Sequence, residues 1–295
     1  MRFLFLLRVL LCICFGLLSF STAANVFFKV THEQRDQTAY VLGTMHLLCK
    51  DSFVMPDTVY QALANSEQLI VEVNLTDDAE LEAAQSAMFQ QPRNYLQRYL
   101  NSEQYSQLEH QTQRQLGRPL SSLAPLRPLI ISSLFLADYL PCESETFSVD
   151  EAIIEHAVSK DTLVIGLESA KWQLELFDQV DLSEQVSALY ELVTEKEVAQ
   201  HELISMADTY LSGNGKKLHE VMLAQDDFIG ASALFLDQRN QTWVQKLPQL
   251  FVGKRSFVAV GAGHLYGDQG LLSLLIAQGY EITPIPVSFG AVESH

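Results

Sequence analysis

Short apolar runs of strand length alternate along this chain with longer stretches in which apolar residues recur at helical spacing. The runs predict strands at 25–30, 38–42, 68–73, 162–167, 256–260 and 280–285. The helical pattern predicts helices at 56–65, 152–158, 183–213, 228–247 and 268–278, the third as one long helix or a broken pair. This alternation is typical of an α/β fold.

Two of the predicted strands, 163–167 and 257–260, are nearly continuous apolar runs. Strands with this composition are buried on both faces, as in a mainly parallel central sheet covered by helices. Residues 77–140 are mainly helical, with breaks at proline and glycine. This block is too helical for a simple crossover, so we expect it to form a helical insertion that covers the sheet.

The amino-terminal segment differs in character from the rest of the chain. Two arginines precede or begin a short apolar run at 9–20, and small residues follow at 21–24. This order is typical of a secretory signal peptide, and the run is too short to span a membrane. We predict a signal peptide at 1–24, cleaved after Ala24, and one domain at 25–295 that is periplasmic or secreted and has no membrane span.

The net charge limits the classes of molecule that the protein can bind, and the cysteine content limits its possible disulfides. Removing the signal peptide takes away two arginines, so the formal net charge of −17 becomes −19. A surface this acidic argues against nucleic acid or anionic lipid as the main partner, because both attract Lys and Arg. Only Cys49 and Cys142 remain in the mature chain. They either pair in an oxidising compartment or stay unpaired in loops.

Four polar residues lie inside or just after apolar strands: His46, Glu72, Glu168 and His264. Ligands of open α/β sheets bind beyond the carboxyl ends of the strands, so these side chains converge if the strands are parallel neighbours. Each residue also has a structural alternative. The histidines could be hydrogen-bonded structural residues, Glu72 could face water from an edge strand, and Glu168 could cap a helix.

Both histidines end a G-x-x-H motif, at 43–46 and 261–264. Each motif follows an apolar strand and has glycine where the chain turns sharply or approaches a ligand closely. The second motif lies in a glycine-rich turn before a helix, a place that can bind an anion through backbone N–H groups. The H-E-x-x-H, G-x-S-x-G and phosphate-loop motifs do not occur.

Longer segments resemble proteins of the TraB/GumN family over residues 39–286. The first has a strand, G-T-x-H, a loop, P-x-x-V-x-x-A-L and a strand with an acidic residue, in YVLGTMHLLCKDSFVMPDTVYQALANSEQLIVEVN. The second is similar to the central segment of the family, SVDEAIIEHAVSKDTLVIGLESAKWQLELF. The third is similar to its last part, LDQRNQTWVQKL followed by FVAVGAGHLYGDQGLLSLLIAQGYEITPI. The loop at 48–50 departs from the small, Gly-containing turn of the family.

The resemblance implies an EreA/ChaN/Tiki-like fold. Tiki proteins are described as metal-dependent proteases with two G-x-x-H motifs and a required acidic residue, and some bacterial relatives are linked to shutting down peptide pheromones. By position, His46 and His264 match the motif histidines and Glu72 matches the acidic residue. Further polar positions of the family match Glu168, Asp150, Arg239 and Asn240.

Two of these matched residues keep alternatives. Arg239 could form a surface ion pair on its helix, or it could bind a substrate carboxylate or orient Glu72. Asp150 could simply favour the amino terminus of a helix electrostatically, and we prefer this interpretation to catalysis.

We therefore predict a metal-dependent hydrolase that acts on a peptide or a related amide or ester. His46, His264 and Glu72 would hold a divalent Mn, Co or Zn ion, which would polarise the carbonyl and lower the pKa of a bound water. The predicted catalytic residues are Glu72, Glu168 and Arg239. Glu168 would support the ligands or act as general base, and Arg239 would stabilise developing negative charge.

The alternative is a periplasmic binding protein without catalysis, which sequesters a peptide or a haem-like ligand in the same crevice. A third hypothesis is a degenerate enzyme whose site survives for interaction only. The sequence gives no oligomeric state.

Overall fold

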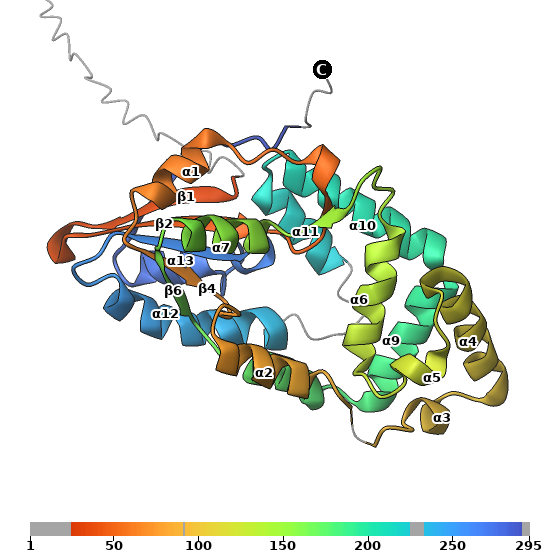
Figure 1. Cartoon of the computed structure of the whole chain (residues 1–295). Coiled ribbons are helices and arrows are strands. Elements are labelled where there is room, and N and C mark those ends of the chain that lie inside the picture. The colour runs from red at the N-terminus through yellow and green to blue at the C-terminus, as the bar shows by residue number, and fades with distance from the viewer. Residues whose placement is uncertain (1–24, 91, 225–232, 291–295) are drawn as a thin grey trace, which may run out of the picture.

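The computed structural model describes residues 25–90, 92–224 and 233–290, and the predicted signal peptide at 1–24 lies outside them. A six-stranded sheet with the order β6-β4-β7-β2-β1-β8 forms one half of the molecule (Figure 1). Its strands are β1 (Phe27–His32), β2 (Gln37–Thr44), β4 (Gln68–Val71), β6 (Leu163–Gly166), β7 (Ser256–Gly261) and β8 (Glu281–Pro284).

Four neighbouring strands of this sheet, β6, β4, β7 and β2, are parallel, and β1 is antiparallel to both of its neighbours, β2 and β8. The register sets Val71 of β4 opposite Gly166 of β6 and Ala259 of β7. The carboxyl ends of the parallel strands therefore meet at one edge of the sheet. The predicted α/β fold with a mainly parallel central sheet is confirmed.

Burial differs between the two strands predicted to be buried on both faces. β7 lies in the middle of the sheet and is buried from Ser256 to Val260, as predicted. β6 is the edge strand, and its Leu163 is 51% exposed, so the prediction was wrong for this strand. An apolar run of four residues is compatible with either position, because the order of strands is not written in it.

Helices cover both faces of the sheet (Figure 1). Val59 and Ile153 pack into the apolar core of one face, and Trp243 and Leu275 into the core of the other. They belong to α1 (Asp57–Ala64) and α7 (Val149–Ser159), and to α12 (Gln238–Leu250) and α13 (Leu271–Ala277). Ser148 caps α7 by accepting a hydrogen bond from the Glu151 N–H, which fixes where this helix begins.

A third apolar core lies beside the sheet, in what we call the helical half (Figure 1). Phe135, Tyr139 and Leu189 are fully buried in it. The helical half consists of α3 (Leu96–Tyr99), α4 (Ser102–Leu116), α5 (Leu120–Leu123), α6 (Pro128–Tyr139), α9 (Leu182–Thr194) and α10 (Lys196–Leu211). The helical insertion predicted at 77–140 is thus present, but its buried residues form a core beside the sheet and do not cover it, as had been expected. The helical pattern at 183–213 is a broken pair.

The remaining elements join the two halves. α2 (Asp78–Ala87) packs against α8 (Ala170–Glu175), and α11 (Gly215–Ala224) packs against α10. Of the helix predicted at 228–247, the described part is the π-helical segment η5 (Ala233–Asp237) followed by α12. The short 3-10 segments are η1 (Glu33–Arg35), η2 (Lys50–Ser52), η3 (Leu176–Gln179) and η6 (Ala262–His264).

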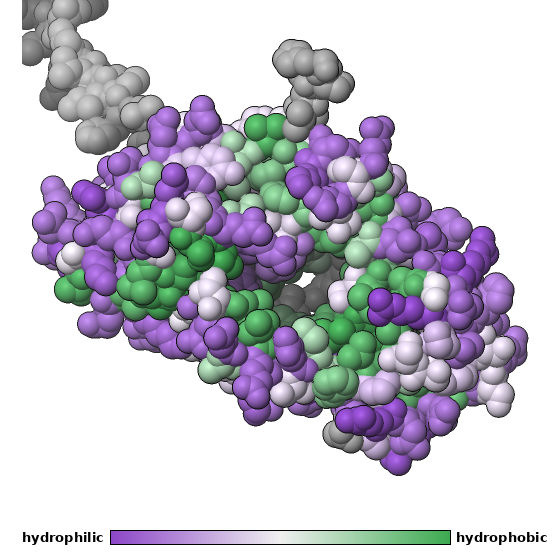
Figure 2. Space-filling view, in the orientation of Figure 1, coloured by the Kyte–Doolittle hydropathy of each residue, from purple (hydrophilic) through white to green (hydrophobic). Residues whose placement is uncertain are grey.

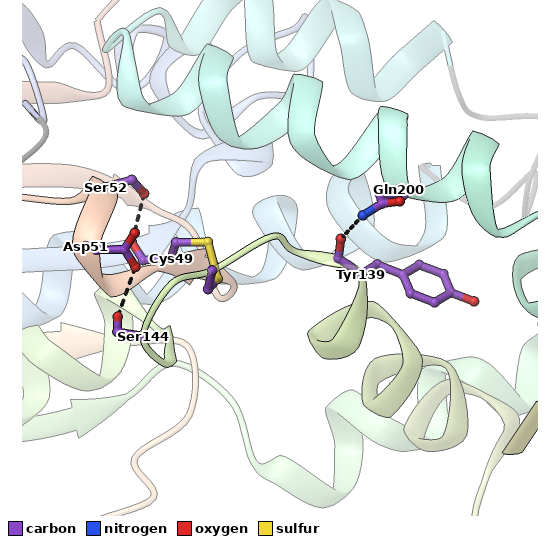
Figure 3. The surroundings of a disulfide bond; sticks show 7 residues. Cys49, Asp51, Ser52, Tyr139, Ser144 and Gln200 are labelled. Carbon is purple, nitrogen blue, oxygen red and sulfur yellow. Dashed lines mark hydrogen bonds between the residues drawn. A yellow bond between two sulfur atoms is a disulfide. The ribbon is translucent and has the colours of Figure 1, made fainter. Parts of the chain in front are cut away.

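A disulfide between Cys49 and Cys142 ties the loop after β2 to the end of the helical half (Figure 3). Cys49 lies in β3 (Leu48–Cys49), which pairs with β5 (Thr146–Phe147) in a two-stranded sheet. Ser144 Oγ donates to Asp51 Oδ1 at 2.9 Å next to the bond. Of the two alternatives for the cysteines, the structure has the pair.

Among the described residues, no helix is long and apolar enough to cross a bilayer.

Candidate functional site

The ends of three of the four parallel strands, β2, β4 and β7, line one cavity of about 330 Å³. Glu168, Glu72, His264 and His46 follow β6, β4, β7 and β2, in the order of these strands across the sheet. Glu72, His264 and His46 line the cavity, and Glu168 contacts Arg239, which also lines it. The surface is hollowed between the sheet and the helical half, with hydrophobic residues along the rim (Figure 2).

The first glycine of each G-x-x-H motif allows this close approach. A Cβ on Gly261 would lie 3.3 Å from Glu72 Oε1 and 3.9 Å from His46 Nε2. A Cβ on Gly43 would lie 2.9 Å from the Cα of Ala262, in the other motif. The two motifs therefore interlock, and each glycine stands where a side chain would displace its neighbour.

Arg239 holds the two carboxylates together. Its Nη2 contacts Glu72 Oε2 and lies 2.6 Å from Glu168 Oε1, and its Nε donates to the same Glu168 oxygen at 2.9 Å. The Arg239 side chain is 9% exposed, so the alternative of a surface ion pair is wrong. Glu72 is 7% exposed, so the alternative of an edge-strand residue facing water is wrong as well.

Neighbouring groups complete the contacts of the carboxylates. The Gly261 N–H donates to Glu72 Oε1 at 2.7 Å, and Gln173 Nε2 donates to Glu72 Oε2 at 3.0 Å. Trp243 Nε1 donates to Glu168 Oε2 at 2.8 Å. Ser169, and not Glu168, caps α8. Glu168 is therefore committed to the buried cluster.

Burial and charge act in opposite directions on these acids. Burial is the largest influence on Glu72 and raises its pKa, but Arg239, the two histidines and the Gly261 N–H together outweigh it and hold that pKa at about 2. Burial also raises the pKa of Glu168, above its ordinary value, although Arg239 and Trp243 oppose the change. Desolvation lowers the pKa of Arg239, and the two glutamates more than compensate.

His264 is held as a neutral ring. Arg239 Nη1 lies 3.0 Å from His264 Nε2, and a guanidinium can only donate, so this nitrogen accepts. His264 Nδ1 then carries the proton and donates to Asn240 Oδ1 at 2.8 Å. Burial lowers the pKa of His264 to about 3, and the charge of Arg239 adds to this effect. The ring also lies against Trp243, with 4.3 Å between centroids.

His46 stands at the mouth of the cavity, with its side chain 67% exposed. Its Nδ1 lies 2.8 Å from Asp150 Oδ2, and Thr44 Oγ1 donates to the other oxygen of this carboxylate at 2.6 Å. The Asp150 carboxylate raises the pKa of His46 to about 9. Asp150 thus does more than favour the amino terminus of α7: it anchors His46 with Nε2 on the side of Glu72.

Residues that the sequence analysis did not single out also contribute. Gln173 and Trp243 each donate a hydrogen bond to one glutamate. Trp243 lies four residues after Arg239 on α12, and the guanidinium stacks over its ring at 4.7 Å. This spacing puts both on one helix face, a signal that the sequence contained.

The cavity wall opposite the polar cluster is apolar. It combines side chains from the loop after β2, from α10 and α11, and from η5. They are Met45, Leu47, Met206, Leu218, Met222 and Leu236. Methionine adapts its shape easily, so this wall suits an apolar group of variable form.

A divalent metal does not fit the predicted ligands as they are arranged. His264 Nε2 and Glu72 Oε1 are 3.9 Å apart, but that Nε2 already accepts from Arg239. Within residues 25–90, 92–224 and 233–290, no three His, Cys, Asp or Glu side chains are placed to hold a metal ion. The Arg239 guanidinium contacts both His264 and Glu72, two of the three predicted ligands.

Comparisons with known proteins place the chain in a family. YbaP of Shigella flexneri, an uncharacterised protein, is 25% identical over 243 residues, which are 80% of this chain and 87% of YbaP. YbaP of Escherichia coli (strain K12), also uncharacterised, is 25% identical over 242 residues, with the same shares. No solved structure matches the chain, so the EreA/ChaN/Tiki-like fold stays a prediction. The model of the TraB/PrgY/gumN family matches residues 26–284, from β1 to β8 and through all four strand ends, and the chain therefore belongs to the TraB/PrgY/gumN family.

Proposed function

We propose that this protein is a hydrolase that cleaves a peptide or a related amide or ester bond in the cavity at the strand ends. The observation that carries the proposal is the convergence of His46, Glu72 and His264 on the backbone of Gly261, beside an apolar wall. Proton-transferring and charged groups that face a shared cavity are the usual composition of a hydrolytic site.

His46 is the proton carrier of this proposal. Asp150 holds its Nδ1, which leaves Nε2 on the side of Glu72 and the cavity. With its pKa raised to about 9, the ring is protonated at neutral pH, so its Nε2 can donate a proton to a leaving group. Glu72, at the floor of the same cavity, is an ionised carboxylate that orients the water.

The substrate of this proposal is an uncharged or cationic molecule with an apolar side chain. The buried cluster has two carboxylates, Glu72 and Glu168, for one guanidinium, and the apolar wall faces it. An additional carboxylate on the substrate would be repelled there. The formal net charge of −17 for the full chain acts in the same direction at long range.

The proposed location is the periplasm or the cell exterior. The Cys49–Cys142 disulfide supports it, because such bonds persist in oxidising compartments. The signal peptide predicted at 1–24 also supports export to the periplasm or the cell exterior.

A panel of peptide p-nitroanilides and p-nitrophenyl esters with apolar or succinylated acyl groups tests the proposal on the purified mature chain. We expect hydrolysis of the apolar members, and a loss of about 100-fold or more in kcat/KM for His46→Ala, the usual weight of a proton-transferring group. His201→Ala is the matched control, since His201 is exposed on α10, outside the site, and should leave the rate unchanged.

Equal rates for the wild type and His46→Ala would contradict the proposed role of His46. Tight binding of a panel member without turnover would favour the alternative, a protein that sequesters a peptide or a haem-like ligand. Adding Mn²⁺, Co²⁺ or Zn²⁺, with a chelator as the reference, tests the metal dependence predicted from the sequence in the same assay.

A further inference from the structure

The guanidinium of Arg239 lies at the centre of the donors that a metal would use. Nη2 contacts Glu72 Oε2 and lies 2.6 Å from Glu168 Oε1, while Nη1 lies 3.0 Å from His264 Nε2. Both nitrogens belong to one rigid planar group, so two carboxylates and one imidazole surround a single positive centre.

This cation is fixed in place. All five N–H groups of Arg239 have acceptors, because Nη1 also donates to the Phe235 carbonyl at 3.3 Å. The side chain is 9% exposed and stacks over Trp243. A buried charge with this number of partners has no other position that satisfies its donors.

A metal ion and Arg239 compete for the same lone pairs. A divalent cation bound to His264 Nε2 would need the lone pair that Arg239 Nη1 uses, and it would meet a positive charge at contact distance. Carboxylate and neutral imidazole are good ligands for Mn, Co and Zn, so the donors themselves suit a metal. Because Arg239 already uses these lone pairs, the two glutamates and His264 bind its guanidinium and not a metal ion.

We infer that Arg239 is the resident cation of this site, which keeps a divalent metal out of the cluster of Glu72, Glu168 and His264. Without the guanidinium, the same three side chains should draw together around a divalent metal, which they are too far apart to bind while Arg239 separates them. This inference goes beyond hydrolysis: it concerns which positive charge the site uses, whatever reaction takes place there.

Binding of Co²⁺ tests the inference without an activity assay. Co²⁺ bound by imidazole and carboxylate absorbs visible light, and equilibrium dialysis followed by elemental analysis gives its stoichiometry. We expect folded Arg239→Ala to bind about one equivalent at least 100-fold more tightly than the wild type, and to lose this binding when His264→Ala is added. Arg239→Lys is the matched control, because lysine keeps the positive charge and should exclude Co²⁺ as the wild type does.

Two results would overturn the inference. One is about one equivalent of Co²⁺ in the wild type that is lost in His264→Ala, because metal and guanidinium would then coexist. The other is the absence of binding by both Arg239→Ala and Arg239→Gln in folded form, as judged by circular dichroism. If neither variant folds alone, we expect added Co²⁺ to restore the fold, and failure to restore it contradicts the inference. A wild type without hydrolysis would remove the proposed function and leave this measurement intact.

Discussion

Asn240 links the backbone of the second motif to the ring of its histidine. Its Oδ1 accepts from His264 Nδ1 at 2.8 Å, and its Nδ2 donates to the carbonyls of His264 and Gln269 at 3.2 and 2.9 Å. Asn240 is 1% exposed, so water does not replace these bonds. One amide thus sets both the orientation and the tautomer of the buried ring.

Asn240→Ala should therefore destabilise the protein by about 1–3 kcal/mol for each buried group left without a partner. The measurement is the free energy of unfolding in urea. Asn240→Asp is the comparison: it keeps the acceptor for His264 Nδ1, loses the donors, and adds a negative charge next to the cluster. A loss within experimental error for Asn240→Ala would show that another group orients His264.

At the scale of elements, the position of a strand in the sheet decides what its leucines contribute. Leu69 of β4 is fully buried between β6 and β7, whereas Leu163 of the edge strand β6 is 51% exposed. Both belong to strands of four residues, and Leu163 pairs in register with Gln68, next to Leu69.

Leu69→Ala should cost about 2–5 kcal/mol of unfolding free energy, because it removes buried contacts and leaves a cavity. Leu163→Ala, the matched control on the neighbouring strand, should change stability by roughly 0.5 kcal/mol or less. Thermal or urea unfolding of the two variants compares them directly. Equal losses would mean that β6 is covered in solution by a partner.

The same contrast shows how far the sequence predicts the fold. Apolar periodicity located the strands of the large sheet and most of its helices, and the position after each strand identified His46, Glu72, Glu168 and His264. The order β6-β4-β7-β2 could not be read from the pattern, because it depends on pairing between distant segments. β3 and β5 were missed since two residues are too short for an alternation.

The centre of the candidate site was less accessible from the sequence. Arg239 came from the family resemblance, and its contact with both glutamates depends on how α12 packs across the sheet. Gln173 lies far from Glu72 in sequence and meets it only because β6 and β4 are neighbours. No local pattern predicts such a contact, and none predicts that Arg239 contacts both Glu72 and His264, two of the three predicted metal ligands.

For the whole molecule, the disulfide is the covalent link between the loop of His46 and the helical half. Cys49 and Cys142 are 93 residues apart, so the bond closes a long loop and restricts the unfolded chain. Next to it, the β3–β5 pairing holds the same loop by hydrogen bonds.

Replacement of both cysteines by serine should lower the free energy of unfolding by about 2–4 kcal/mol. The fold should persist, because the three apolar cores are built mainly from other side chains, although both cysteines pack against the core of the helical half. Reduction of the wild type by dithiothreitol is the parallel measurement and should give a similar loss. If reduced and oxidised protein unfold at the same urea concentration, the bond contributes nothing to stability.

The location of β7 between β4 and β2 also governs when this molecule can fold during synthesis. The ribosome makes Glu72 167 residues before Arg239, and the central strand of the sheet is made later still. Until then, β2 and β4 lack the strand that joins them, and a carboxylate destined for the interior has no cation. A nascent or truncated chain thus carries exposed apolar strands and no assembled site. The site can assemble only once the last part of the chain is available, and the chain needs protection from aggregation until then.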